Sequence, residues 1–372
     1  MSSIEQYYLD AKARQEAYRQ KCLTVLESFQ DPIDRKRIEA YVKDPQFYWN
    51  PMEAVRFALG PEIYHPDIQR YATLMEQATW FAEQVSFQED KKDWNVIDEG
   101  TKHIVRNILG FFQVFDHIVG QNININFMSE INCKDAQHVY IIQADQERIH
   151  EKSYDLQPRG ICRGQELLDI LNAVKNNPII PTMISWIEKY MHDDVPIGIR
   201  LIAFIMVEGV WFSGAFCFLH WLKQKNILPG ITQSNEFIRR DEGIHTDFGC
   251  YLVNKYLIIK PHHSEMSELV QSATEIADEF INEAIPVRLA GMNSELMSQY
   301  IRFQADTVVK MMGYSPVFNA SNPFKFMESF DILDKKSFFE VKPTAYKNET
   351  NSESFQIDYN TMNNDLESLD FY

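Results

Sequence analysis

Residues 147–154 read ERIHEKSY, and residues 242–245 read EGIH. Each stretch places a histidine three residues after a glutamate. On a helix, residues three and seven apart share one face, so Glu147, His150 and Tyr154 lie along a single stripe. Two Glu-x-x-His pairs on separate helices are the ligand arrangement of a carboxylate-bridged two-metal site inside a helical bundle. The two stretches therefore predict both a metal centre and the bundle that holds it.

Two more carboxylates stand alone in apolar surroundings. Asp116 lies within the apolar stretch 104–119, and Glu208 lies within the apolar stretch 202–212. A buried ionised carboxylate costs several kcal/mol unless it is paired, protonated or bound to a metal. We therefore expect Asp116 and Glu208 to complete the ligand set, which is Asp116, Glu147, His150, Glu208, Glu242 and His245.

The donor set indicates the kind of metal. Four carboxylates carry a charge that two divalent cations neutralise, and oxygen-rich ligation with one imidazole per metal favours iron or manganese over thiolate-binding ions. The sequence does not distinguish iron from manganese. The alternative is that each motif arises by chance and that each histidine is an ordinary residue with a hydrogen-bond partner. Two such motifs together with two isolated carboxylates favour the metal centre.

The order of elements predicts an all-α protein, because strand-like alternation is scarce. Long helices are expected from about residue 66, over about 100–127, over about 134–156 with Pro158 ending the run, over about 198–225, and from about 234 to 257. Two more are expected over about 263–289 and 293–312. We predict three regions, which are a peripheral helical extension (1–50), the bundle (51–340), and a flexible C-terminal tail (341–372).

Composition excludes several classes of function. The net charge of -17 repels phosphate backbones, so nucleic acid is not an expected partner. The apolar run 199–221 is interrupted by Arg200 and Glu208, so no membrane span is expected. The five cysteines are scattered and form no Cys-x-x-Cys pair, which indicates a reducing, cytoplasmic location. No glycine-rich phosphate loop is present, and no cofactor besides the metals is expected.

The motifs resemble the small, radical-bearing subunit of class I ribonucleotide reductase, in its eukaryotic-type branch. The likeness extends over about residues 56–346. It is carried by VEG at 207–209 with FSG at 212–214, by LPGITQSNEFIRRDEGIHTDF at 228–248, and by NPF at 322–324. The resemblance implies a ferritin-like helical bundle with a di-iron centre, in which Glu147 and Glu242 bridge the two metals.

The resemblance also implies roles for residues beyond the ligands. Tyr154 falls where the family keeps its stable tyrosyl radical, and Trp80 and Asp241 fall where it has electron-transfer residues linked to His150. By themselves Tyr154 and Trp80 would be packing aromatics and Asp241 a solvated charge. Tyr346 resembles the tail tyrosine that relays the radical to the large subunit, with Tyr359 as a rival.

The implied function is that of the small subunit of ribonucleoside-diphosphate reductase. Oxygen activation at the metals would produce the Tyr154 radical, and the large subunit would use it to reduce ribonucleotides to deoxyribonucleotides. The implied partners are a second copy of the chain, forming a homodimer, and the large subunit, bound through the tail. Two alternatives stay open: a stand-alone ferritin-like oxygenase or oxidase, and a silent partner paralogue. Neither the need for a flavodoxin-like activator nor the role of residues 1–50 can be read from the sequence.

Overall fold

The computed structural model describes residues 3–29, 31–56, 62–192, 194–284 and 292–330. The predicted tail, 341–372, and with it Tyr346 and Tyr359, lies outside the described residues, as does the predicted boundary at residue 340. The described residues belong to one compact unit, Met1–Ile332.

The described part of the chain is mostly helical, with a single isolated bridge between Phe47 and Leu257 and no strand, so the predicted all-α class is confirmed. The α-helices are α1 (Ser3–Leu26), α2 (Pro32–Val42), α4 (Pro66–Ala78), α5 (Gln88–Val96), α6 (Glu99–Asn122), α7 (Met128–Glu130), α8 (Lys134–Ile161), α9 (Gly164–Asn176), α10 (Ile180–Glu188), α11 (Ile197–Met206), α12 (Phe212–Gln224), α13 (Pro229–Tyr251), α14 (His263–Ala284) and α15 (Ser294–Met311). Three π-helical segments are η3 (Ile123–Phe127), η4 (Val207–Trp211) and η5 (Leu252–Tyr256). Short 3₁₀ turns are η1 (Pro51–Val55), η2 (Ala82–Gln84) and η6 (Lys325–Phe330).

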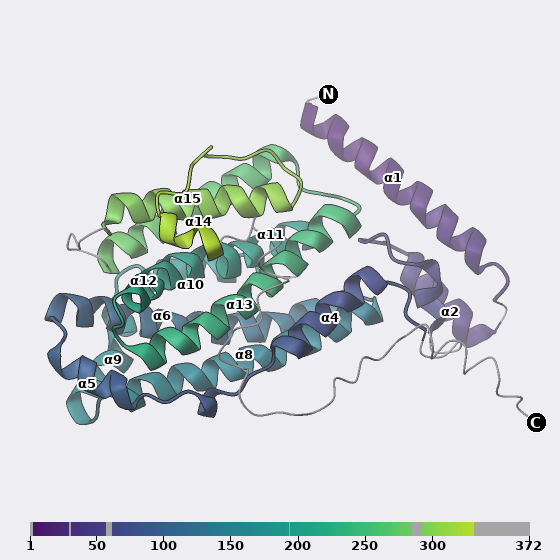
Figure 1. The fold of residues 1–372 in the computed structure, drawn as a ribbon. Coiled ribbons are helices and arrows are strands. Elements are labelled where there is room, and N and C mark those ends of the chain that lie inside the picture. Colours follow the sequence, from purple (N-terminus) through teal and green to yellow (C-terminus); the bar gives the residue numbers. More distant parts are fainter. Residues whose placement is uncertain (1–2, 30, 57–61, 193, 285–291, 331–372) are drawn as a thin grey trace, which may run out of the picture. The chain divides into compact units, whose positions relative to one another are not determined.

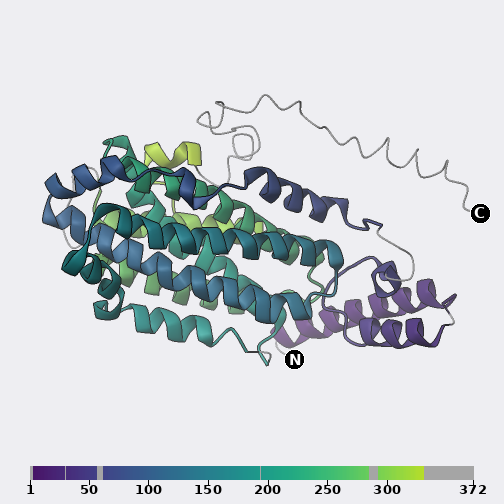
Figure 2. The same ribbon diagram turned by 90° about the horizontal axis from the view of Figure 1, so that it is seen from below.

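Long helices lie side by side at the centre of this unit (Figures 1 and 2). Helix α8 packs against α4, α6 and α13, and α13 packs in turn against α12. The continuous run Ile197–Gln224, formed by α11, η4 and α12, is apolar and long enough to cross a membrane, but 94% of its apolar window is buried inside the protein. Such a helix is a core element, around which the amphipathic helices arrange their apolar faces.

Helix α8 extends beyond its predicted end. Pro158 lies inside the helix, and the helix continues to Ile161, where the Cys162 N–H is bonded to the Pro158 carbonyl at 3.1 Å. A proline has no N–H for the carbonyl four residues earlier, which here belongs to Tyr154. The side-chain amide of Gln113 on α6 donates to that carbonyl at 3.0 Å instead. The prediction that the helix ends before Pro158 is wrong because a neighbouring helix supplies the missing donor.

Helix α13 begins at Pro229, five residues before its predicted start. Proline is favoured in the first helical turn, where its missing N–H has no partner anyway. The backbone N–H groups of Gly230 and Ile231 donate to the buried carboxylate of Asp90 on α5, at 2.8 and 2.7 Å. A carboxylate from another helix therefore caps α13, and a sequence pattern within α13 itself could not reveal that cap.

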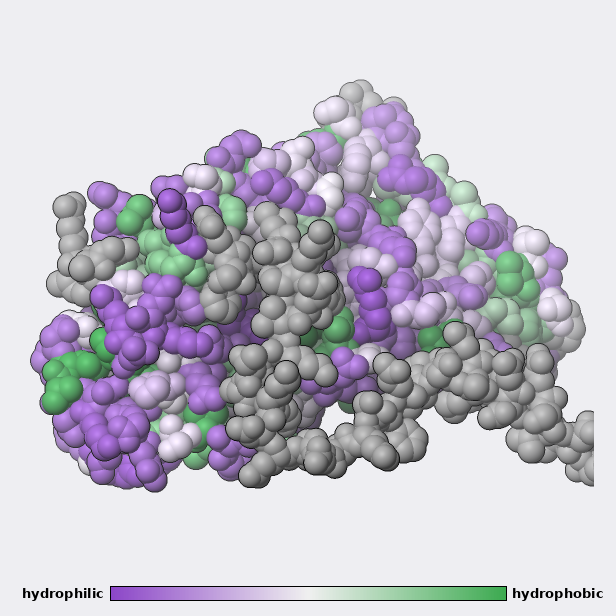
Figure 3. Space-filling model, in the orientation of Figure 1, coloured by the Kyte–Doolittle hydropathy of each residue, from purple (hydrophilic) through white to green (hydrophobic). Residues whose placement is uncertain are grey.

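Residues 3–26 and 32–42 form two helices with few buried apolar residues. Helix α1 contacts the rest of the unit through polar groups. The Gln15 amide donates to Asp44 Oδ1 at 3.0 Å, and the Tyr7 hydroxyl donates to the Lys260 carbonyl at 3.0 Å. On the face drawn in Figure 3, the described residues are mostly hydrophilic, with apolar residues scattered among the polar ones. The proposed boundary of a separate extension at residue 50 remains a prediction.

Candidate metal centre

The six predicted ligands come from four segments and meet inside the bundle. They form two groups that share Glu147 and Glu242, and within each group one ligand atom from every residue lies within 4.8 Å of the others. The first group adds Asp116 from α6 and His150 from α8, and the second adds Glu208 from η4 and His245 from α13. All six side chains are buried. Two overlapping groups with two shared carboxylates are the geometry of a carboxylate-bridged metal pair.

Glu208 is positioned by a π-helical segment. The run from α11 to α12 widens into one π turn, η4, in which Glu208 is the second residue. Single π turns inside α-helices often occur at functional sites because they shift the direction of one side chain. Gly209 follows in this turn, and a Cβ atom there would lie 2.7 Å from Thr246 Cγ2, next to His245. The glycine thus lets η4 approach α13 closely enough for Glu208 and His245 to meet.

The two histidines are oriented alike. The Nδ1 atom of His150 lies 3.0 Å from Glu242 Oε1 and 3.2 Å from Glu147 Oε2, whereas its Nε2 atom lies 3.3 Å from Asp241 Oδ2. The Nδ1 atom of His245 lies 3.1 Å from Glu147 Oε1, and its Nε2 atom lies 2.9 Å from Gln146 Oε1. When Nε2 donates outward, the lone pair of Nδ1 faces the carboxylates, which is the arrangement of a metal-ligating imidazole.

The charges of the cluster shift its pKa values strongly. Burial raises the pKa of Asp116 and of Glu208 well above the usual range, and the other two carboxylates add to that rise. Burial alone would lower the pKa of the two histidines, but the surrounding carboxylates raise both well above the ordinary value. Burial alone would raise the pKa of Glu147, but the two imidazoles lower it to about 2. Without metal, protons must therefore supply part of the positive charge that this cluster requires.

The residues present fit a pair of metal ions. Both oxygens of Asp116, both oxygens of Glu242, and Glu208 Oε2 are buried and accept no hydrogen bond. Close approaches such as that of His150 to Glu242 lack hydrogen-bond geometry. Buried polar atoms are nearly always partnered, and carboxylates that face one another without donors are the expected exception at a cation site. The predicted cluster therefore has the unpaired acceptors that metal binding would satisfy.

Tyr154 lies one helical turn beyond His150 and is fully buried. Its ring stacks on Phe112, with 4.7 Å between ring centroids and 9° between planes, and its hydroxyl has no hydrogen-bond partner. Burial raises the pKa of this phenol well above its usual value, and the negative charge of Asp116 adds to the rise. The phenol is thus a protonated, dry group beside the carboxylates. Phe212, one helical turn after Glu208, and Ile238, one turn before Glu242, are also fully buried.

Trp80 and Asp241 are brought together with His150. The Trp80 indole donates to Asp241 Oδ2 at 2.8 Å, and the same oxygen lies 3.3 Å from His150 Nε2. Asp241 is therefore not the solvated charge that its position in the sequence alone would suggest. Arg240 donates to Asp241 Oδ1 at 3.2 Å through Nε. A continuous set of contacts runs from the partly exposed Arg240 to the candidate metal centre.

Two glutamines that the sequence did not predict as site residues contact the ligands. The Gln143 amide donates to Glu208 Oε1 at 2.7 Å, and the side-chain oxygen of Gln146 lies 2.9 Å from His245 Nε2. Both lie on α8 at positions four and one before Glu147, and both are buried. Their helical spacing from Glu147 was visible in the sequence, but a glutamine on a helix face is ordinarily solvated. Only the packing of α8 against η4 and α13 reveals their role.

A third group of possible ligands, Glu53, His65 and Cys133, is already satisfied. His65 Nε2 accepts from the Asn50 N–H at 3.1 Å, and Glu53 pairs with Arg56 at 3.1 Å. Burial also raises the pKa of the Cys133 thiol, which disfavours the thiolate that binds metals. This group is structural.

Comparison with known proteins agrees with the metal centre that the site geometry indicates. Residues 59–323 match the family described as ribonucleotide reductase, small chain. The ribonucleoside-diphosphate reductase small chain of Trypanosoma brucei brucei is 36% identical over 329 residues, covering 87% of this chain and 96% of the relative. The chain belongs to the ribonucleotide reductase small chain family. The resemblance inferred from the motifs is thereby confirmed, and the chain is assigned to the small-subunit component of ribonucleoside-diphosphate reductase.

Other members agree with this assignment. The ribonucleoside-diphosphate reductase small subunit of Dictyostelium discoideum is 39% identical over 293 residues, covering 78% of this chain and 86% of the relative. Among solved structures, the Rnr4 homodimer of the ribonucleotide reductase from Saccharomyces cerevisiae has a TM-score of 0.67 and 26% identity, covering 87% of this chain and 100% of that chain. The dimanganese(II) NrdF of Streptococcus sanguinis shares the fold, with a TM-score of 0.64 and 16% identity, covering 71% and 95%. The predicted ferritin-like bundle is confirmed.

Proposed function

We propose that this small chain forms a neutral radical on Tyr154 and lends it to a large subunit, which reduces ribonucleoside diphosphates to deoxyribonucleotides. Asp116, Glu147, His150, Glu208, Glu242 and His245 would hold two metal ions, with the two shared glutamates bridging them. The observation that carries the proposal is the position of the buried, unpartnered Tyr154 hydroxyl beside two overlapping ligand groups.

The bound metals would supply the oxidising power, drawn from dioxygen, that removes one electron from Tyr154. Tyr154 also loses the proton of its hydroxyl in this step, because a phenol radical cation is far more acidic than the phenol. Burial and the negative charges of Asp116 and Glu242 raise the pKa of this phenol, so Tyr154 stays protonated until it is oxidised. The stacked ring of Phe112 covers one face of Tyr154, which keeps water and reductants away from the radical.

Asp241 holds two partners at one carboxylate oxygen. Asp241 Oδ2 accepts a hydrogen bond from the Trp80 indole N–H and lies 3.3 Å from Nε2 of His150. This contact chain supports a role for Trp80 and Asp241 in moving an electron and a proton together. Arg240 holds the other oxygen of Asp241 and also donates to the Ala78 carbonyl near the end of α4. The carboxylate is thereby held in one orientation.

Iron is the metal we propose, with manganese as the alternative. Oxygen-rich ligation with one imidazole per ion suits both, and neither the donor types nor their spacing excludes manganese. One protein of the same fold is described as a dimanganese NrdF. Loading metal-free protein with each ion separately, followed by metal analysis and the reductase assay, distinguishes them.

We further propose that the chain forms a homodimer, binds the large subunit through its C-terminal tail with Tyr346 in the relay, and acts in the cytoplasm. The dimer is supported by the homodimeric Rnr4 relative, and the reducing location by five buried cysteines, none of which forms a disulfide. Light scattering of the purified protein measures the dimer.

The direct test of function is reconstitution with the large subunit from the same source. Metal-loaded wild-type chain is expected to support conversion of ribonucleoside diphosphates to deoxyribonucleotides, and Tyr154→Phe is expected to abolish it. Full activity of Tyr154→Phe would reject the radical role. Oxygen consumption without any dependence on the large subunit would instead indicate the oxygenase function.

A further inference from the structure

The second ligand group of the candidate metal centre has buried aromatic neighbours of its own. Tyr140 lies two helical turns before Glu147 on α8, and Phe248 lies one turn after His245 on α13. The rings of Tyr140 and Phe248 meet edge to face, with 5.2 Å between their centroids. Tyr140 is buried, its hydroxyl has no hydrogen-bond partner, and the negative charge of Glu208 adds to the rise that burial causes in its pKa. A buried phenol therefore stands on the second side of the metal centre as well.

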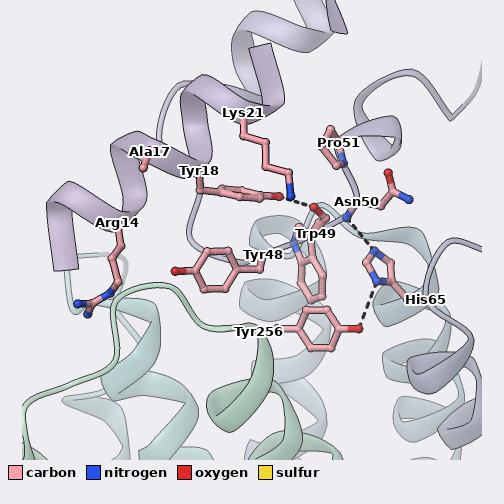
Figure 4. Close-up of a pocket in the computed structure, with 10 residues that line it drawn as sticks. All are labelled: Arg14, Ala17, Tyr18, Lys21, Tyr48, Trp49, Asn50, Pro51, His65 and Tyr256. Atoms are coloured by element: carbon pink, nitrogen blue, oxygen red, sulfur yellow. Dashed lines mark hydrogen bonds between the residues drawn. The ribbon is translucent and has the colours of Figure 1, made fainter. Parts of the chain in front are cut away.

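Ring contacts continue from Phe248 to the surface. The ring of Tyr71 on α4 lies 5.3 Å from that of Phe248, and the ring of Tyr251 lies 5.6 Å from that of Tyr71, both measured between centroids. Tyr71 is buried, whereas Tyr251 is partly exposed. Tyr251 also contacts Tyr256 at 6.0 Å, and the Tyr256 hydroxyl points toward His65 at the pocket between α1 and the body of the unit (Figure 4). We call the following four residues the aromatic path: Tyr140, Phe248, Tyr71 and Tyr251.

Ring contacts at this spacing are ordinary packing in a core rich in aromatic residues, so the contacts alone do not indicate electron transfer. The hydroxyl groups supply a second observation. Tyr71 donates to Asp247 Oδ2 at 3.1 Å, and Tyr251 donates to Asp67 Oδ2 at 2.6 Å. A phenol that loses an electron also releases its hydroxyl proton, and each of these phenols already has a carboxylate within proton-transfer distance. Both tyrosines can therefore be oxidised and reduced without a large rearrangement.

The fold fixes the geometry of the aromatic path. The Arg70 guanidinium lies over both outer rings, 5.0 Å from the centroid of Tyr71 and 5.5 Å from that of Tyr251. The path also reaches the metal centre at a different ligand from the contacts of Trp80. Those contacts lead to His150 in the first ligand group, whereas the aromatic path leads to the second group.

We propose that the aromatic path is a second electron-transfer route, which carries an electron from the surface to the second ligand group when Tyr154 does not take up the oxidising equivalent. The proposal rests on the proposed function, because the bound metals would be the source of that oxidising equivalent. The route protects the site, since an oxidising equivalent with no such route would attack the neighbouring side chains.

Each transfer balances in electrons and protons. Tyr71 gives one electron, through the bridging rings, to the oxidant at the metal centre, and its hydroxyl proton passes to Asp247. Tyr251 then supplies one electron to the Tyr71 radical, which takes its proton back from Asp247. The hydroxyl proton of Tyr251 passes to Asp67. A thiolate from solution finally reduces the Tyr251 radical, Asp67 returns the proton, and two of the resulting thiyl radicals combine to form a disulfide.

The direct test uses full-length Tyr154→Phe protein, reconstituted with ferrous iron and dioxygen in the presence of the spin trap tert-nitrosobutane. The trap captures transient tyrosyl radicals as covalent adducts, which mass spectrometry of peptides locates. We expect an adduct on Tyr251, the partly exposed end of the path, and none when iron is omitted. An adduct on Trp80 alone, no adduct on Tyr251 at full iron content, or equal labelling without iron would overturn the proposal.

A variant tests whether the electron follows the aromatic path. Adding Tyr71→Phe to the Tyr154→Phe protein is expected to abolish the Tyr251 adduct, because the single step from Tyr251 to the metal centre becomes much longer. The matched control, Tyr300→Phe, replaces another buried tyrosine whose hydroxyl is hydrogen-bonded, and it is expected to leave the adduct unchanged. An undiminished adduct with Tyr71→Phe, or equal loss in both variants, would reject the path.

A second variant, Phe248→Leu, removes the bridging ring and keeps both outer tyrosines. It is expected to abolish the Tyr251 adduct in the Tyr154→Phe protein, with circular dichroism and iron content confirming that the variant is folded and loaded. The wild-type chain, reconstituted in parallel, separates this proposal from the proposed function. A Tyr154 radical in the wild type without a Tyr251 adduct in Tyr154→Phe rejects the aromatic path alone, and loss of both signals at full iron content rejects both.

Discussion

The side-chain amide of Gln113 on α6 donates a 3.0 Å hydrogen bond to the backbone carbonyl of Tyr154 on α8. This carbonyl has no helical donor because Pro158 lacks an N–H. Gln113→Leu is therefore expected to lower the free energy of unfolding by about 1 kcal/mol. In a Pro158→Ala background, the new N–H serves the same carbonyl, and Gln113→Leu is expected to cost much less. Chemical denaturation of the four proteins measures this coupling. Equal losses in both backgrounds would contradict it.

His150 and His245 differ in the group that contacts the outer nitrogen. His150 faces the carboxylate of Asp241 at 3.3 Å, whereas His245 faces the neutral amide oxygen of Gln146 at 2.9 Å. Asp241→Asn keeps an acceptor and removes the charge. We expect it to lower the affinity of the metal beside Asp116 by about 10–100-fold, because outer partners tune the basicity of ligating imidazoles.

Metal titration of the Asp241→Asn protein, with the two binding steps resolved, measures this effect. Gln146→Leu is the matched variant on the other imidazole and is expected to affect the second step instead. If both variants weakened the same step, the assignment of one histidine to each metal would be wrong.

The metal-free protein is expected to lose stability as the pH rises from 6 to 8. The folded-state pKa values of both histidines are raised well above the ordinary 6.5, so their contribution is fully present below pH 6.5 and is lost as the pH rises toward the folded values. The raised pKa values of Asp116 and Glu208 act in the same direction above pH 4 to 5. The lowered pKa of Glu147 acts only between about pH 2 and 4.5.

Thermal unfolding at several pH values measures this trend. Metal ions displace the same protons, so the stabilisation by added metal is expected to increase over the interval in which the metal-free protein weakens. Proton release on metal addition in weak buffer provides an independent readout. A metal-free protein that became more stable from pH 6 to 8 would contradict the proposed charge state of the cluster.

Tyr346 and Tyr359 are rivals for the relay to the large subunit. We expect Tyr346→Phe to leave the Tyr154 radical intact and to reduce ribonucleotide reduction to background, because phenylalanine cannot lose a proton with its electron. Tyr359→Phe, thirteen residues further along, is the matched control and is expected to retain activity. The reverse result would place the relay at Tyr359. Radical content is measured by spectroscopy in both variants, so loss of the relay is distinguished from loss of the radical.

The sequence predicts the helical class from its periodicity, and it predicts the metal centre from two Glu-x-x-His pairs and two carboxylates in apolar stretches. Glu147 and His150 share a face by spacing alone, and Asp116 stands out because its neighbours are apolar. What the sequence does not reveal depends on partners distant along the chain. The Gln113 amide extends α8 past Pro158, and Asp90 starts α13 at Pro229.

The same limit applies around the ligands. Gln143 and Gln146 are ordinary helix residues until η4 and α13 pack against them, and the π turn at Glu208 has no local sequence pattern. The stacking of Phe112 on Tyr154 likewise joins two helices whose relative rotation a single sequence does not specify. Packing between helices, and not local propensity, determines these features.

Electron paramagnetic resonance of protein reconstituted with ferrous iron and dioxygen tests the central claim most directly. The account predicts a sharp signal near the free-electron position in the wild-type chain and its absence in Tyr154→Phe with the same metal content. A stable radical that survives in Tyr154→Phe, or no radical despite two bound iron ions per chain, would contradict it.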